Sequence, residues 1–157
     1  LGDVYKRQGM LFNMDGEVVG MISSSVWNDT GKNVVNAYGI SDLKPIIELL
    51  INGKSVPYIG IYGTTVTEQL AEEHKMPSGI YVADVDPDSP AMAAGIQIGD
   101  IICEASGEEI KDIAAYQNIV IGSSVGETME FVGKRLGSDG YVNIKFSVVT
   151  TEKEEVK

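Results

Sequence analysis

Few side chains in this sequence could perform nucleophilic or acid–base chemistry. The chain holds one histidine, His74, and one cysteine, Cys103, so a two-imidazole site and an intrachain disulfide are excluded within it. His74 follows Glu72 and Glu73, which is typical of a solvated surface position. Cys103 lies in an apolar stretch and is interpreted as a small buried residue rather than a nucleophile. The serines at residues 23–25 have no base nearby and are interpreted as a strand edge.

Three alternate aspartates, Asp84, Asp86 and Asp88, are the best candidates for a metal site. Their spacing resembles the start of a calcium-binding loop, whose oxygen ligands alternate along the chain. Such a loop needs glycine at its sixth position and glutamate at its twelfth, but these positions hold Ser89 and Gly95. The sequence therefore predicts no metal site, and no motif in it indicates a cofactor.

The charge of the chain is strongly negative and unevenly distributed. Its 157 residues include 12 basic and 23 acidic side chains, which gives a net charge of −11. Residues 1–56 carry −1 of this charge and residues 57–157 carry −10. Nucleic acids and anionic membrane surfaces bind clustered Lys and Arg, so we expect neither as a partner. Apolar residues make up 43% of the chain, as in a soluble globular protein, and no apolar run is long enough to span a membrane.

Turn and capping residues divide the chain into short elements. Asp15-Gly16 between two apolar runs predicts a β-hairpin, followed by a third strand over residues 33–40 and a helix over residues 42–51 capped by Ser41. Further elements are expected downstream: strands over residues 58–66, 79–85, 101–105, 127–136 and 141–150, and helices over residues 68–74, 90–94 and 112–121. Thr67, Ser89 and Asp112 are expected to cap these three helices. In the last strand, alternate residues are expected to face the core: Val142, Ile144, Phe146 and Val148.

Three short motifs and one glycine mark residues 57–150: YIGI at residues 58–61, DPDSPA at residues 86–91, AGIQIGDII at residues 94–102 and Gly107. With these residues, the segment 57–150 resembles a PDZ domain of the bacterial HtrA/Deg type. The resemblance implies an α+β, mostly β fold: a small, partly open β-barrel with two to three helices. It also implies that the domain binds peptide C-termini or unfolded protein segments by strand addition.

Residues 9–53 resemble the last strands and closing helix of the trypsin-like protease domain in the same family. The matching residues are GMLFN at 9–13, DGEVVG at 15–20 and YGIS at 38–41. The family places its nucleophilic serine two residues before the glycine that matches Gly9, where this chain has Arg7. The histidine and aspartate partners belong to upstream segments of the family. This chain is therefore expected to lack a Ser-His-Asp triad and to be inactive alone, and its parent is a serine endopeptidase or, alternatively, a pseudoprotease or adaptor.

The resemblance also implies where the peptide binds. The YIGI segment could be an ordinary strand start, or a loop whose backbone amides bind a carboxylate while Gly60 leaves room for the ligand. The helix over residues 112–121 could be plain core or a groove wall, with Ala114 and Ile121 nearer the core. The expected peptide-binding residues are Tyr58, Ile59, Gly60, Ile61, Tyr62, Ile113, Tyr116, Gln117 and Val120. We expect a β-branched residue at position 60 to abolish binding without unfolding the domain.

The expected organisation has five parts. Residues 1–8, LGDVYKRQ, resemble the translated end of a sequencing adapter and are interpreted as a cloning or sequencing artefact, with a natural terminus as the alternative. Residues 9–53 are the protease remnant, 54–56 a linker, 57–150 the PDZ domain and 151–157 a mobile tail. Three strands of an incomplete barrel cannot bury their apolar faces alone, so we expect residues 9–40 to be weakly ordered or to depend on contact with the PDZ domain. By resemblance, the parent is expected in the cell envelope, as a homo-trimer and with membrane anchoring left open.

Overall fold

The computed structural model describes residues 9–22 and 37–152. The interpretations of residues 1–8, including Arg7, of the serines at 23–25 and of the start of the third strand lie outside these residues. The chain divides into two compact units, Leu1–Asn52 and Gly53–Lys157.

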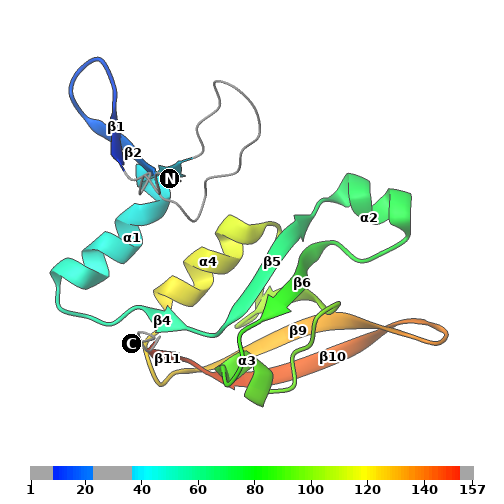
Figure 1. Ribbon diagram of the computed structural model, residues 1–157. Coiled ribbons are helices and arrows are strands. Elements are labelled where there is room, and N and C mark those ends of the chain that lie inside the picture. Colours follow the sequence, from blue (N-terminus) through cyan, green and yellow to red (C-terminus); the bar gives the residue numbers. More distant parts are fainter. Residues whose placement is uncertain (1–8, 23–36, 153–157) are drawn as a thin grey trace, which may run out of the picture. The chain divides into compact units, whose positions relative to one another are not determined.

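The first unit contains a three-stranded antiparallel sheet and one helix (Figure 1). Its elements are β1 (Gly9–Phe12), β2 (Val18–Ile22), β3 (Tyr38–Gly39) and α1 (Ile40–Ile51). The predicted hairpin is confirmed: β1 pairs with β2, and Gly16 takes φ +81° in the turn between them. The Asn13 side-chain oxygen accepts hydrogen bonds from the backbone amides of Asp15 and Glu17, at 3.0 and 2.9 Å, and these bonds fix the turn.

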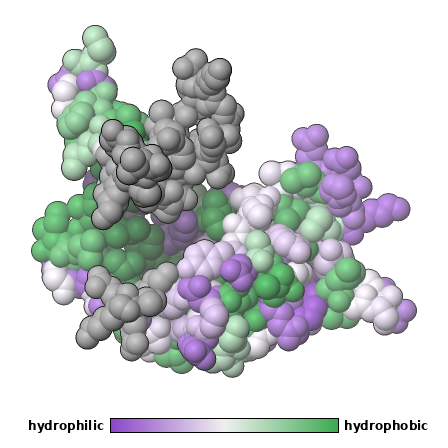
Figure 2. All heavy atoms as spheres, viewed as in Figure 1, coloured by the Kyte–Doolittle hydropathy of each residue, from purple (hydrophilic) through white to green (hydrophobic). Residues whose placement is uncertain are grey.

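The helix α1 differs from its prediction at its start and on its surface. It begins at Ile40 with Gly39 at its N-cap, because β3 leads directly into the helix and Ser41 already lies in the first turn. None of its residues is buried; Leu50 and Ile51 are 60% and 79% exposed. Hydrophobic residues accordingly cover the visible face of this helix in Figure 2. The described part of the first unit is therefore too small to cover its own apolar surface.

The second unit is built on one antiparallel sheet with the strand order β10-β9-β7-β6-β5, and β8 pairs with β7 (Figure 1). The strands are β4 (Pro57–Tyr58), β5 (Ile61–Val66), β6 (Gly79–Val85), β7 (Ile101–Ala105), β8 (Glu108–Glu109), β9 (Thr128–Gly137), β10 (Gly140–Val149) and β11 (Thr151–Glu152). The helices are α2 (Glu68–His74), α3 (Pro90–Ala93) and α4 (Ile113–Gly122). The mixed, mostly β architecture predicted from the sequence is confirmed.

The core of the second unit lies where the sheet meets α3 and α4. Ile80, Val82 and Phe131 are fully buried and pack with residues of both helices. The alternation predicted for β10 holds at Val148, which is 1% exposed, but fails at Val142, which is 53% exposed. The reason is the sheet geometry: β7 pairs with β9 only as far as Lys134, so the β9–β10 hairpin extends beyond the sheet and Val142 has nothing to pack on.

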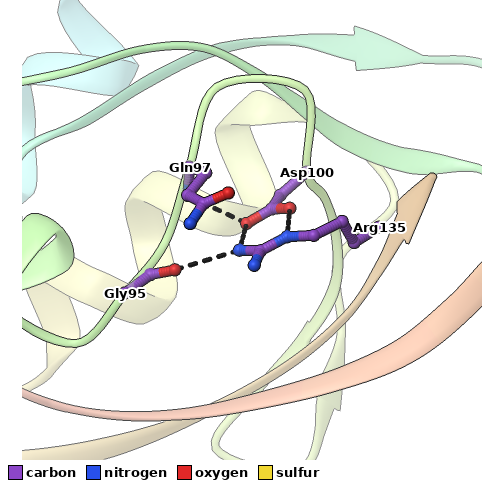
Figure 3. Close-up of polar contacts among 4 residues, drawn as sticks. All are labelled: Gly95, Gln97, Asp100 and Arg135. Atoms are coloured by element: carbon purple, nitrogen blue, oxygen red, sulfur yellow. Dashed lines mark hydrogen bonds and ion pairs between the residues drawn. The ribbon is translucent and has the colours of Figure 1, made fainter. Parts of the chain in front are cut away.

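An ion pair fixes the loop between α3 and β7 (Figure 3). Asp100 is 1% exposed. Its carboxylate accepts two hydrogen bonds from the Arg135 guanidinium, at 2.6 and 2.8 Å, and one from the backbone amide of Gln97 at 2.9 Å. Arg135 also donates to the Gly95 carbonyl at 2.9 Å. These bonds raise the pKa of Arg135 above its usual range, and they give the buried carboxylate a full set of partners.

The C-terminal segment corrects the prediction that a mobile tail starts at residue 151. Thr151 and Glu152 form β11, which pairs with Tyr58 and Pro57 of β4. The buried Thr150 hydroxyl just before it donates to the Ser124 carbonyl at 2.6 Å. This polar anchor and the β4 pairing order the chain as far as Glu152.

Candidate functional site

The strand β5 forms one edge of the sheet. Its inner side pairs with β6, and no other strand pairs with its outer side among the described residues. Because alternate residues of a strand direct their backbone groups to opposite sides, the register decides which groups are available. Asp86 donates its amide to the Gly60 carbonyl at 2.9 Å, so residues 60 and 62 face β6. The backbone groups of Ile61 and Gly63 consequently face the open edge.

The loop that leads into β5 presents further backbone amides. The predicted strand over residues 58–66 is interrupted here, because Gly60 takes φ +91° between β4 and β5. The Ile59 carbonyl accepts the Ala91 amide at 3.0 Å, so the carbonyls of this loop are bound to α3 and the end of β6. Within the described part of the chain, the amides of Ile59 and Gly60 donate no hydrogen bond. Consecutive unbonded amides of this kind form a site for an anion such as a carboxylate.

Two tyrosines and one aspartate support the loop. The hydroxyls of Tyr58 and Tyr62 both donate to the Asp86 carboxylate, the second at 2.8 Å. Burial and the bond to Asp86 raise the pKa of Tyr58 above its ordinary value, so this hydroxyl stays protonated as a donor. Asp86 therefore holds both β4 and β5 in place. Sequence reasoning considered Asp86 as a possible metal ligand and as part of the DPDSPA motif, but it missed this role because the tyrosine contacts span 24 and 28 positions of the sequence.

The helix α4 lies beside β4 and β5 (Figure 1). The predicted cap is confirmed: Asp112 accepts the Ala115 amide at 2.7 Å. The Ile113 amide donates to the Thr65 hydroxyl at 3.1 Å, which fixes the start of α4 against the C-terminal end of β5. Thr65 was not predicted as a site residue, since its contact spans 48 positions of the sequence.

The predicted peptide-binding residues of α4 divide into buried and exposed ones. Tyr116 and Val120 are each 7% exposed and belong to the same hydrophobic cluster as Ile59 and Ile61. Burial raises the pKa of the Tyr116 hydroxyl. Ile113 is half-buried against this cluster, whereas Gln117 is exposed. The structure thus brings loop, strand and helix together, and most of the helix stripe serves as core.

Two further expectations for this region are wrong. Ala114 was placed nearer the core but is exposed, and Ile119, which was not considered, packs against the core instead. A side chain at position 60 was expected to leave the domain folded. A Cβ on Gly60 would lie 2.3 Å from the Cβ of Ser89 and 2.8 Å from the Tyr58 hydroxyl oxygen, and Ser89 caps α3 by accepting the Met92 amide. Gly60 is therefore needed for the fold as well as for access to the loop.

A hollow in the second unit is lined by residues outside α4. Its volume is about 870 Å³, and it contains no residue of α4 or β5. Its lining residues are Tyr58, Asp86, Pro87, Asp88, Ser89, Pro90, Ala93, Ala94, Ser147, Val149, Thr151 and Glu152. Among the described residues, no group of three or more His, Cys, Asp or Glu side chains is placed to hold a metal ion.

Comparison with known proteins identifies the fold and the relatives. The family described as PDZ domain matches residues 81–135. The chain is 31% identical over 142 residues to a DegP-like serine endoprotease of Halomonas elongata, whose name describes it as periplasmic; this match covers 87% of the chain and 30% of that protein. It is 30% identical over 160 residues to the serine protease Do-like HtrA of Bacillus subtilis, which covers 94% of the chain and 34% of that protein.

A solved structure adds a comparison at the level of the domain. The HtrA3 PDZ domain bound to a phage-derived ligand, FGRWV, is 33% identical with a TM-score of 0.50, and the match covers 60% of this chain and 84% of that one. The chain spans about a third of the length of the curated relatives it matches. On the evidence of the sequence match and the fold, this chain carries a PDZ domain and is a relative of the HtrA/DegP serine proteases.

Proposed function

We propose that residues 57–150 bind the C-terminus or an extended apolar segment of another protein by strand addition along β5. The observation that carries this proposal is the open edge of β5, which begins at the amides of Ile59 and Gly60. A terminal carboxylate would accept hydrogen bonds from these amides. The last residues of the peptide, which precede the carboxylate, would pair with the backbone of Ile61 and Gly63. The HtrA3 PDZ domain, a relative, has a peptide ligand, which supports the proposal.

The expected affinity is moderate. One buried apolar side chain contributes about 1.5–3 kcal/mol, and the main-chain bonds add to it, but ordering the peptide offsets part of this gain. We therefore expect dissociation constants on the order of micromolar. The pocket for the terminal side chain would be shaped by Ile61 from the strand and by Gln117 and Val120 from α4. Ile113, whose amide is bonded to Thr65, would lie beside peptide residues further from the C-terminus.

The test uses FGRWV, the ligand of the related HtrA3 domain, and two altered peptides. Fluorescence anisotropy should show saturable binding of FGRWV. A C-terminal amide should weaken binding by about tenfold or more, since it removes a charged acceptor of hydrogen bonds. N-methylation of the last peptide bond should weaken binding as well, because strand addition needs this N–H. Equal affinity for all three peptides would contradict strand addition with carboxylate recognition.

The contribution of α4 can be tested on its exposed face. Gln117 and Asn118 are neighbouring exposed residues of the same helix, so alanine should be tolerated at both. If Gln117 lines the groove, Gln117→Ala changes the affinity for FGRWV and Asn118→Ala does not. Equal effects of the two substitutions would remove α4 from the proposed groove.

A second proposal concerns the longer protein that the resemblance implies. We propose that it is a serine endopeptidase whose PDZ domain delivers or senses substrate, with a pseudoprotease or adaptor as the alternative. We also propose the domain boundaries given above for residues 9–53 and 54–56, and a PDZ domain that starts at residue 57 and includes β11 as far as Glu152. The test is the uninterrupted genomic reading frame: serine at the position of Arg7 supports a protease, whereas any other residue supports the alternative.

The relatives also bear on location. The periplasmic name of the Halomonas elongata relative supports an extracytoplasmic location. In the part of the chain that the structure describes, none of the helices has both the length and the apolar composition of a membrane span. Membrane anchoring and a trimeric parent are proposals, and fractionation and analytical ultracentrifugation of the complete protein would test them.

A further inference from the structure

The outward face of the β5–β6 edge is acidic. Tyr62 pairs with Asp84 across the two strands, and both side chains are exposed. Asp86 lies two residues further along the same face and accepts the Tyr62 hydroxyl at 2.8 Å. Two carboxylates therefore flank Tyr62 next to the open edge. This cluster is not explained by carboxylate binding, which it would disfavour through like-charge repulsion.

The register of an added strand determines which peptide residue meets this cluster, and this step rests on the proposed function. A carboxylate at the amides of Ile59 and Gly60 makes the peptide antiparallel to β5. Its last residue then lies opposite Ile61 and its penultimate residue opposite Tyr62. Directly opposed residues of antiparallel strands point to the same face of the sheet. Because Ile61 is buried and Tyr62 is 43% exposed, the last side chain points inward and the penultimate one points outward.

We propose that Asp84 and Asp86 make the penultimate position of the bound peptide selective for a lysine or arginine side chain. Neighbouring strands are about 4.8 Å apart, so the penultimate backbone lies roughly 10 Å from that of Asp84. The length of a lysine side chain spans most of this gap. Its ammonium group would pass over the ring of Tyr62, where a cation is also favoured by the aromatic face.

The other charged groups near this face do not cancel the acidic cluster. Lys134 belongs to β9, three strands away from β5 in the sheet order, and donates to the Asn143 side chain at 2.5 Å. Arg135 is already bound to Asp100 in the ion pair described above. Asp88 follows Asp86 closely and adds to the negative charge. The local field at the penultimate position is therefore negative.

The test compares three peptides, FGRXV, in which X is lysine, norleucine or glutamate. Norleucine matches the length of the lysine chain without its charge. At low ionic strength we expect lysine to bind about threefold more tightly than norleucine and about tenfold more tightly than glutamate. Both ratios should shrink at about 0.5 M salt, since these charges are exposed to solvent.

A matched pair of variants locates the effect. Asp84→Asn should reduce the preference for lysine over norleucine, whereas Asp139→Asn removes the same charge from the β9–β10 turn and should leave the preference intact. Circular dichroism would verify that both variants are folded. Equal binding of the three peptides, or an unchanged preference in Asp84→Asn, would overturn the inference while leaving the proposed function standing. Failure of every peptide to bind would overturn both.

Discussion

Removing the guanidinium of Arg135 should destabilise the PDZ domain far more than removing an exposed charge. The substitution Arg135→Met keeps much of the apolar length of the side chain, which lies over the ring of Phe146, but deletes three hydrogen bonds of 2.6 to 2.9 Å. The Asp100 carboxylate is 1% exposed and would then keep only the hydrogen bond from the backbone amide of Gln97.

The expected magnitude follows from this burial. Breaking a buried pair by removing one partner costs about 3–5 kcal/mol. The Arg135 side chain is 32% exposed, so solvent screens part of this interaction, and we expect a loss of about 2–3 kcal/mol. The matched control is Lys111→Met, which breaks a 3.9 Å pair with Glu109 in which both side chains are more than 70% exposed. The control should cost less than about 0.5 kcal/mol.

Native-state hydrogen exchange is the appropriate assay, because it reports on this unit alone. The most protected amides of β7 and β9 should lose about 30- to 150-fold in protection in Arg135→Met, which corresponds to the expected 2–3 kcal/mol. A double variant, Arg135→Met with Asp100→Asn, should lose less than the sum of the single losses, since no buried charge is left unpaired. A loss in Arg135→Met no greater than in Lys111→Met would show that the Arg135–Asp100 pair does not stabilise the domain.

Three further predictions follow from local geometry. Gly60→Val should destabilise the domain by about 2 kcal/mol or more in urea denaturation, because its Cβ collides with Ser89 and its φ of +91° is unfavourable for a β-branched residue; unchanged stability would contradict the described loop. Asp112→Ala should cost about 1 kcal/mol by loss of the α4 cap, and Asp112→Ser should recover most of it. Burial raises the pKa of the Cys103 thiol, so at pH 8 its thiolate fraction is lower and it should react with a disulfide reagent more slowly than the unfolded chain does; equal rates would count against this environment.

Local rules predicted much of this fold. Thr67, Ser89 and Asp112 were identified as helix caps, and each accepts a backbone amide at the helix it precedes. The hairpin at Asp15-Gly16 was predicted correctly for the same reason, since a turn is decided by a few adjacent residues. Caps and turns depend on neighbours in the sequence, and these can be read without knowing the tertiary structure.

The features that were missed depend on residues far apart in the sequence. The Arg135–Asp100 pair joins positions 35 apart, and β11 joins Thr151 to Tyr58 at the opposite end of the domain. The helix α4 carries apolar residues on several faces, so its sequence could not separate the buried Tyr116 from the exposed Ala114. The candidate site shows the same division: the loop at Gly60 was identified, whereas its supports, Asp86 and Ser89, were not.

Peptide binding as proposed depends on the amides at the start of β5, which would receive the carboxylate of the peptide. The most direct measurement is an NMR titration of the isotope-labelled chain with FGRWV and with its C-terminal amide. We expect the amide resonances of Ile59, Gly60 and Ile61 to move most with the free acid and far less with the amide. Shifts of equal size with both peptides, or shifts confined to the hollow between α3 and β10, would contradict it.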